Sequence, residues 1–221
     1  MITLETINGI WNYYLSLEKD LDNTSRYIEP KGQENVFSFE FAKLLVLSCT
    51  ELESVLKLLC NECGAEKRGN MGEYKETLLT HYPKIIFAEV HIARWGKTIR
   101  PFDGWNERRL PWWDAYGNVK HNRENNFTEA TYKNVVYALS ALYISIFYLS
   151  NGSLIGEKIQ NSGSYGFGED SYVLSDGSRY ITKWMRYSGG AYMAYPLHLS
   201  VNNERPLPPS NLRHTQNEKF V

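Results

Sequence analysis

The stretch Val135-Val-Tyr-Ala-Leu-Ser-Ala-Leu-Tyr-Ile-Ser-Ile-Phe-Tyr-Leu149 decides the fold. Its apolar residues run almost all the way round a helix, and such a helix must be covered on most sides. The stretch is too short for a membrane span, which needs about 20 apolar residues. It therefore predicts a buried central helix, covered by neighbouring helices or by a second subunit. The second alternative leads us to expect a homodimer.

Sequence signals mark both ends of this central helix, which we place at residues 128–150. Thr128 is expected to cap the N-terminus, with Phe127 and Tyr132 forming a hydrophobic staple around the cap. Gly152 stands just past the C-terminus, where glycine commonly ends a helix. The helix is therefore predicted to begin at a local capping motif.

Three earlier segments show the three- and four-residue spacing of apolar side chains that is typical of amphipathic helices. The first follows Thr3, a candidate N-cap. The second follows Ser38 and ends before Gly64. A shorter helix is expected from Met71 to Tyr82. Most of the chain before residue 150 is thus predicted to be helical.

Two segments depart from the helical spacing. Residues 83–110 are irregular, and within them we expect strands at 85–92 and 98–102. After residue 150 the composition shifts, because 8 of the 16 glycines and 4 of the 8 prolines fall there. Residues 165–201 combine a hairpin signature with alternating apolar side chains, which predicts a three-stranded antiparallel meander. An extended tail follows.

The predicted fold class is therefore mainly α: an antiparallel helical bundle with a small C-terminal antiparallel β-meander. We expect the bundle to occupy residues 1–151, with 83–110 as an insertion, and the Gly/Pro-rich segment to occupy 152–221. Of the 221 residues, 43% are hydrophobic and 22% are charged, which excludes wholesale disorder. The net charge of −1 argues against whole-surface nucleic-acid binding and against a polybasic membrane anchor.

The cysteines favour a reducing compartment and no metal. Cys60 and Cys63 form a CxxC pair, but they share one helical stripe with Cys49 and several leucines. Buried thiols behave as small hydrophobic groups, so we favour core packing over a zinc site and expect no metal and no cofactor. No basic and apolar leader is visible at the N-terminus, so we expect a cytoplasmic protein that does not bind a membrane.

The segment Pro111-Trp-Trp-Asp-Ala-Tyr-Gly-Asn-Val-Lys-His-Asn-Arg123 carries the candidate chemistry. Proline is well tolerated in a first helical turn, so a helix is expected to begin at Pro111. On this helix Asp114, Asn118 and His121 line one polar face, and Arg123 follows just past the expected end. An imidazole can exchange a proton near neutral pH, and a guanidinium can stabilise a pentavalent phosphate. These four residues are the candidate catalytic set for phosphodiester chemistry.

A basic surface surrounds this helix. Residues 94–123 carry seven Lys or Arg and three Asp or Glu, a local charge of +4. The candidate phosphate or partner surface consists of Lys120, Arg108, Arg109, Trp112, Trp113 and Tyr116. An ordinary structural interpretation stands beside it. Lys120 and His121 would complement the carbonyls at the C-terminal end of the helix, Asp114 would complement its N-terminal end, and the tryptophans would pack in the core.

Several motifs together resemble the HEPN superfamily, over roughly residues 1–150. They are a helix with Glu51, Glu53 and Lys57, the sequence Pro-Phe-Asp-Gly-Trp at 101–105, the pattern Trp-Trp-x-x-Tyr-x-x-Val-Lys-His-x-Arg at 112–123, and Phe127-Thr-Glu-Ala130. The resemblance implies an up-and-down helical bundle, often dimeric, in an uncharacterised bacterial branch. Many HEPN proteins are metal-independent RNases of toxin–antitoxin or phage-defence systems.

The resemblance makes His121 the candidate catalytic histidine, but the sequence departs from the family pattern in its arginine. HEPN RNases pair an arginine with a histidine a few residues later, and two such pairs meet across a dimer. The positions five, six and seven residues before His121 hold Tyr116, Ala115 and Asp114. The nearest upstream arginine is Arg109, twelve residues back.

Two functional hypotheses follow. In the first, the protein is an RNA-cleaving toxin or defence protein in which His121 is the base, and Arg123 stabilises the phosphate with help from Asn118. In the second, it is a non-catalytic scaffold that binds a partner protein such as an antitoxin, a nucleotide or RNA. The scaffold would use the aromatic surface around Trp112 and Trp113, or the C-terminal sheet.

Overall fold

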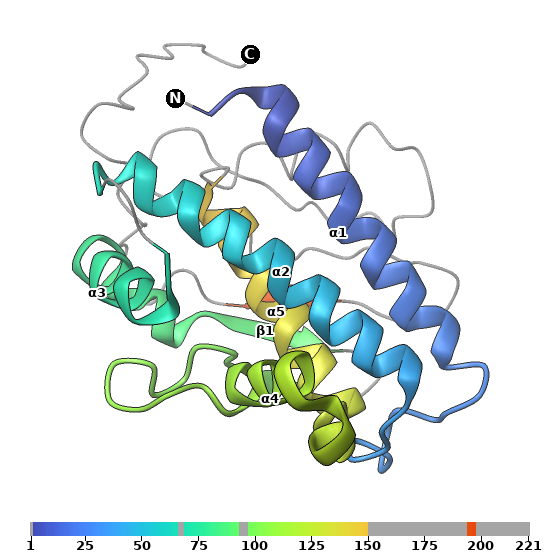
Figure 1. The fold of residues 1–221 in the computed structure, drawn as a ribbon. Coiled ribbons are helices and arrows are strands. Elements are labelled where there is room, and N and C mark those ends of the chain that lie inside the picture. The colour runs from blue at the N-terminus through green and yellow to red at the C-terminus, as the bar shows by residue number, and fades with distance from the viewer. Residues whose placement is uncertain (1, 66–68, 93–96, 150–193, 198–221) are drawn as a thin grey trace, which may run out of the picture.

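The computed structural model describes residues 2–65, 69–92, 97–149 and 194–197, and this part of the chain is mainly helical (Figure 1). The elements in chain order are α1 (Leu4–Thr24), α2 (Phe39–Glu62), α3 (Met71–His81), the 3-10 helix η1 (Pro83–Phe87), β1 (Glu89–Ile92), β2 (Lys97–Ile99), α4 (Pro111–Asn126), the 3-10 helix η2 (Phe127–Glu129), α5 (Tyr132–Leu149) and β3 (Ala194–Leu197). The predicted mainly α class is confirmed.

Helix α5 forms the centre of the core. All its residues from Ala138 to Leu149 are buried, as the apolar stretch predicts. Helices α1, α2 and α4 pack against α5, which runs behind α2 in Figure 1. The chain's own helices thus supply much of the cover that α5 requires, and the homodimer stays a prediction. Among the described helices, none has the length and apolar character needed to span a membrane.

Local capping groups fix the ends of the first two helices. The Thr3 Oγ1 accepts the backbone N–H of Thr6 at 3.2 Å, and the Ser38 Oγ accepts that of Phe41 at 3.1 Å. Gly64 takes a φ of +76° just after α2, which glycine adopts without the strain that a Cβ would bring. The predicted starts of both helices and the end of the second are confirmed.

The beginning of α5 differs from its prediction. Residues Phe127–Glu129 form a 3-10 turn, α5 begins at Tyr132, and the Thr131 Oγ1 accepts the N–H of Asn134 at 3.2 Å. The predicted cap at Thr128 is therefore wrong. The physical reason is a contact distant in sequence, because the Tyr132 N–H donates to the carbonyl of Val36 at 2.9 Å.

The predicted staple between Phe127 and Tyr132 is wrong as well. The Phe127 ring packs instead against Phe37 and Phe39, with ring centroids 5.3 and 4.6 Å apart. The Tyr132 ring lies against Phe41, 5.5 Å between centroids. These aromatic contacts thus pack η2 and the start of α5 against the first turn of α2 and the residue Phe37 before it.

The small sheet lies beside the helices. Strand β1 pairs antiparallel with β2, with Val90 opposite Ile99, so the predicted strand pair exists in shortened form. The strand predicted from residue 85 begins only at Glu89, because Pro83–Phe87 form a 3-10 helix. Strand β3 pairs antiparallel with the other edge of β1. The rest of the predicted 165–201 meander and the tail lie outside the described residues.

Candidate functional site

Helix α4 carries the candidate site, and its N-terminal end is firmly anchored. Pro111 occupies the first turn as predicted, and the Leu110 carbonyl accepts the N–H groups of Trp113 and Asp114 at 3.0 and 3.1 Å. The Trp112 indole is 2% exposed, and its Nε1–H donates to the Pro101 carbonyl at 2.7 Å. Trp112 therefore belongs to the core, where it fastens the start of α4 to the preceding loop.

A kink divides α4 directly after His121. Asn122 has φ −149° and ψ 61°, which breaks the helical hydrogen-bond ladder, although helical residues continue to Asn126. The side-chain amide of Asn126 donates to the Asn122 carbonyl at 2.9 Å. The amide of Asn125 donates to the Asn122 Oδ1 at the same distance. His121 therefore stands at the end of the first straight part of α4, and Arg123 lies beyond the kink.

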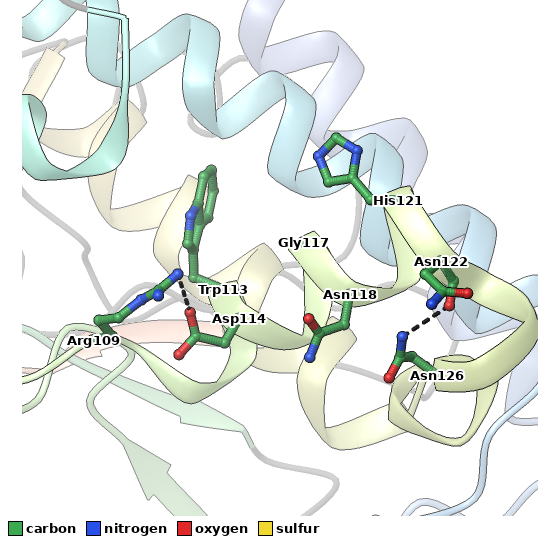
Figure 2. Close-up of a pocket in the computed structure, with 8 residues that line it drawn as sticks. All are labelled: Arg109, Trp113, Asp114, Gly117, Asn118, His121, Asn122 and Asn126. Carbon is green, nitrogen blue, oxygen red and sulfur yellow. Dashed lines mark hydrogen bonds and ion pairs between the residues drawn. The ribbon is translucent and has the colours of Figure 1, made fainter.

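A pocket of about 620 Å³ lies along the outer face of α4, and we call it the α4 pocket. The described residues that line it are Arg109, Trp113, Asp114, Gly117, Asn118, His121, Asn122 and Asn126 (Figure 2). It brings together three of the predicted catalytic residues, Asp114, Asn118 and His121. Arg123 is exposed and is not among these lining residues.

The arginine of the α4 pocket is Arg109. Its Nη2 lies 2.7 Å from the Asp114 Oδ1. Figure 2 shows this ion pair at one end of the pocket and the exposed His121 side chain towards the other, with Gly117 between them. A guanidinium has five N–H donors, so one carboxylate oxygen does not exhaust those of Arg109. An anion in the pocket would therefore still meet a cationic donor.

Gly117 keeps the middle of the α4 pocket open. It lies four residues after Trp113 and four before His121, so all three share one face of the helix. A Cβ placed on Gly117 would have no described heavy atom within 4 Å. Glycine inside a helix costs about 1 kcal/mol relative to alanine. Sequence reasoning missed this residue, although its spacing between an indole and an imidazole was a usable signal.

Asn118 connects the pocket to the turn that follows α4. Its Nδ2 donates to both carboxylate oxygens of Glu129, at 3.1 and 3.0 Å. The backbone carbonyl of Glu129 in turn accepts the side-chain amide of Asn134, at 2.8 Å. The Asn118 amide nitrogen thus donates to Glu129, while the Asn118 Oδ1 can still accept a hydrogen bond from a ligand in the α4 pocket.

Lys120 and Tyr116 fasten α4 to α2. The Lys120 Nζ donates to the Tyr116 hydroxyl at 2.9 Å, and this hydrogen bond raises the pKa of Lys120. The same hydroxyl lies 3.4 Å from the Glu53 Oε2 on α2. The Tyr116 ring packs against that of Trp113, 4.9 Å between centroids. Lys120 is therefore held by a contact with its own helix, on the side of α4 that faces α2, and it is not among the residues that line the α4 pocket.

The cysteines add no ligand set to this site. Cys49 and Cys60 are fully buried and are not part of a disulfide, and burial raises the pKa of the Cys49 thiol well above its usual value. No group of three or more His, Cys, Asp or Glu side chains is placed to hold a metal ion among the described residues.

Neither a protein-family model, nor a curated protein, nor a solved structure matches this chain.

Proposed function

We propose that the protein is a HEPN-like endoribonuclease that holds the RNA phosphodiester in the α4 pocket. One observation carries the proposal: an exposed imidazole, His121, and a guanidinium, Arg109, line the same open pocket. An imidazole can act as the general base of metal-independent RNA cleavage, and a guanidinium can stabilise the charge that develops on the phosphate. We choose RNA as the substrate because the motifs resemble those of HEPN proteins, many of which are RNases.

The proposed reaction is a transesterification within the RNA. A neutral His121 imidazole takes the proton of a ribose 2′-hydroxyl, whose oxygen then attacks the adjacent phosphorus. The bond from phosphorus to the 5′-oxygen breaks, and that oxygen takes a proton from solvent. The products are a 2′,3′-cyclic phosphate and a 5′-hydroxyl end, and no oxidant, reductant or further reactant is consumed.

Arg109 replaces Arg123 as the phosphate-binding arginine in this proposal. Arg109 lines the pocket with His121, whereas Arg123 follows the kink at Asn122. Asp114 orients the Arg109 guanidinium through their 2.7 Å ion pair. Free N–H donors of the guanidinium would then stabilise the charge that develops on the pentavalent phosphate. The side-chain amides of Asn122 and Asn126 add polar groups at the His121 end.

A second candidate function is RNA or partner binding without cleavage. The same ion pair supports it, because Asp114 neutralises much of the Arg109 charge before any phosphate arrives. A protein that has lost cleavage would keep the α4 pocket, the contact by which Trp112 anchors α4, and the surface around the pocket. A partner protein such as an antitoxin, or a second copy of the chain, would then be the biologically relevant ligand.

The test is cleavage of single-stranded RNA by purified full-length chain in the presence of a metal chelator. We expect fragments that end in 2′,3′-cyclic phosphate. His121→Gln should slow cleavage by about 10²- to 10⁴-fold, the usual contribution of a general base. Arg109→Gln should slow it by about 10²- to 10³-fold, as loss of a phosphate-stabilising donor does. In cells, expression of the wild type should inhibit growth and His121→Ala should relieve the inhibition.

Two matched controls are available on the chain. His81→Gln removes an exposed histidine from α3, and Arg123→Gln removes the arginine beyond the kink. Both controls should cleave RNA as the wild type does. Equal activity of wild type and His121→Gln, or no cleavage by either, contradicts the nuclease and favours binding alone. A loss with Arg123→Gln but not with Arg109→Gln would restore Arg123 as the phosphate ligand.

A further inference from the structure

A second pocket, of about 520 Å³, adjoins the α4 pocket, and we call it the Trp113 pocket. Arg109 and Trp113 line both pockets, so the two meet at these side chains. The other described lining residues come from the start of α3 and from the loop before α4: Asn70, Met71, Gly72, Lys75, Trp105, Glu107, Arg108 and Leu110. None of the reaction chemistry proposed above requires this pocket.

One wall of the Trp113 pocket consists of closely packed apolar side chains. Trp105 and Leu110 are each 2% exposed, and Met71 packs against the core. Trp113 is partly exposed, and its ring is held by Trp112 and Tyr116 at centroid distances of 5.9 and 4.9 Å. An indole that is fixed before a ligand binds loses little conformational freedom on binding. The pocket therefore offers a prepared surface for a flat, apolar group.

Three basic side chains lie at the rim of the Trp113 pocket. Lys75, Arg108 and Arg109 line it together with Glu107, and Arg108 and Arg109 are also paired with carboxylates outside this lining, Asp103 and Asp114. The Arg108 Nη2 binds the Asp103 Oδ2 at 3.0 Å. Its guanidinium also lies over Gly104, so that a Cβ at this position would stand 2.5 Å from the Arg108 Nε. Arg108 is thus positioned, and it keeps further N–H donors for an anion.

We propose that the Trp113 pocket binds an unpaired nucleobase of single-stranded RNA, which stacks on Trp113 while the flanking phosphates contact Lys75, Arg108 and Arg109. The choice of RNA rests on the proposed function; the base and phosphate chemistry rests on the pocket itself. A flat apolar wall beside cations complements a nucleotide, and 520 Å³ lies within the usual size of small-ligand pockets.

This arrangement gives the α4 pocket a substrate preference. A strand whose base is held at Trp113 continues past Arg109 to His121, because Arg109 lines both pockets. Bases within a duplex are stacked and paired, so they cannot enter the Trp113 pocket without being extruded. The protein should therefore select unpaired RNA, with the cleaved phosphate next to an exposed base.

The test compares two RNA hexamers, one with bases and one in which every nucleotide is abasic. Binding is measured by fluorescence anisotropy on a full-length chain that carries His121→Gln, so that the RNA stays intact. We expect the base-containing hexamer to bind about 5- to 150-fold more tightly, the range that one stacked base contributes. Adding Trp113→Ala should reduce this preference to nearly onefold.

The control is Tyr27→Ala, which removes an aromatic side chain that is 87% exposed and lies outside both pockets. It should keep the full base preference. Equal binding of both hexamers without any Trp113 substitution overturns the inference, and this measurement does not depend on whether Trp113→Ala folds. Adenosine monophosphate binding as tightly as the hexamer also overturns it, in favour of a free nucleotide.

The outcomes separate this inference from the proposed function. A chain that cleaves RNA through His121 but shows no base preference contradicts only the Trp113 pocket. A chain that prefers bases through Trp113 but does not cleave contradicts only the nuclease, and it supports the binding alternative.

Discussion

Two core tyrosines, one on α1 and one on α5, differ in what their hydroxyl groups contact. The Tyr14 hydroxyl donates to the carboxylate of Glu18 at 3.1 Å, and both residues are buried. The Tyr143 hydroxyl, fully buried beside them, has no hydrogen-bond partner among the described residues. A buried polar group without a partner costs about 1–3 kcal/mol. The two hydroxyls should therefore affect stability in opposite directions.

Removing each hydroxyl in turn tests this difference. Tyr143→Phe should leave the free energy of unfolding unchanged or raise it by about 1 kcal/mol, because only an unpaired group is lost. Tyr14→Phe should lower it by about 1–3 kcal/mol, because the buried Glu18 loses a donor. Urea denaturation followed by circular dichroism measures both values. An equal loss in the two variants would show that the Tyr143 hydroxyl is hydrogen-bonded in the folded protein.

The site residues that the sequence predicts correctly as neighbours are those on one regular helical segment. Asp114, Asn118 and His121 share a pocket because three- and four-residue spacing places them on one face of α4. The arginine could not be assigned in this way. Arg109 precedes the helix, so its direction depends on the turns of the preceding loop, and Arg123 follows a kink that helical spacing does not reveal.

The start of α5 also shows the difference between what a local sequence pattern predicts and what depends on contacts distant in sequence. The caps at Thr3 and Ser38 are local, and the sequence predicts both. At α5 the sequence predicts the cap at Thr128, but a distant contact places it at Thr131. The bridge between Phe37 and Thr131 places the second threonine at the helix start, and no local pattern contains that information.

Paired substitutions at these threonines measure which of them acts as the cap. Thr131→Ala should lower the free energy of unfolding by about 0.5–2 kcal/mol, because the Asn134 N–H loses its acceptor. Thr128→Ala should change it by less than about 0.5 kcal/mol, since Thr128 is exposed. Chemical denaturation of the two variants side by side gives both values. The reverse order would place the helix start at Thr128 after all.

For the whole molecule, the apolar sequence of α5 predicted a covered helix but left open what covers it. The structure gives α5 a cover of α1, α2 and α4 from the same chain. Sequence periodicity identifies which helices are apolar, but the packing partners depend on how the whole chain folds. A homodimer, if it forms, therefore does not have to bury α5.

The monomer should consequently fold at protein concentrations too low for a dimer to form. A partner that binds only the folded state raises the midpoint of thermal unfolding as its concentration rises. Across the concentrations at which light scattering finds a monomer, we expect a cooperative transition with one constant midpoint. Leu142→Ala, at a fully buried position of α5, should lower the free energy of unfolding by about 2–5 kcal/mol at every concentration. Calorimetry at several concentrations measures both effects. A midpoint that rises with concentration, and a Leu142→Ala loss that shrinks with it, would mean that a second subunit contributes to folding.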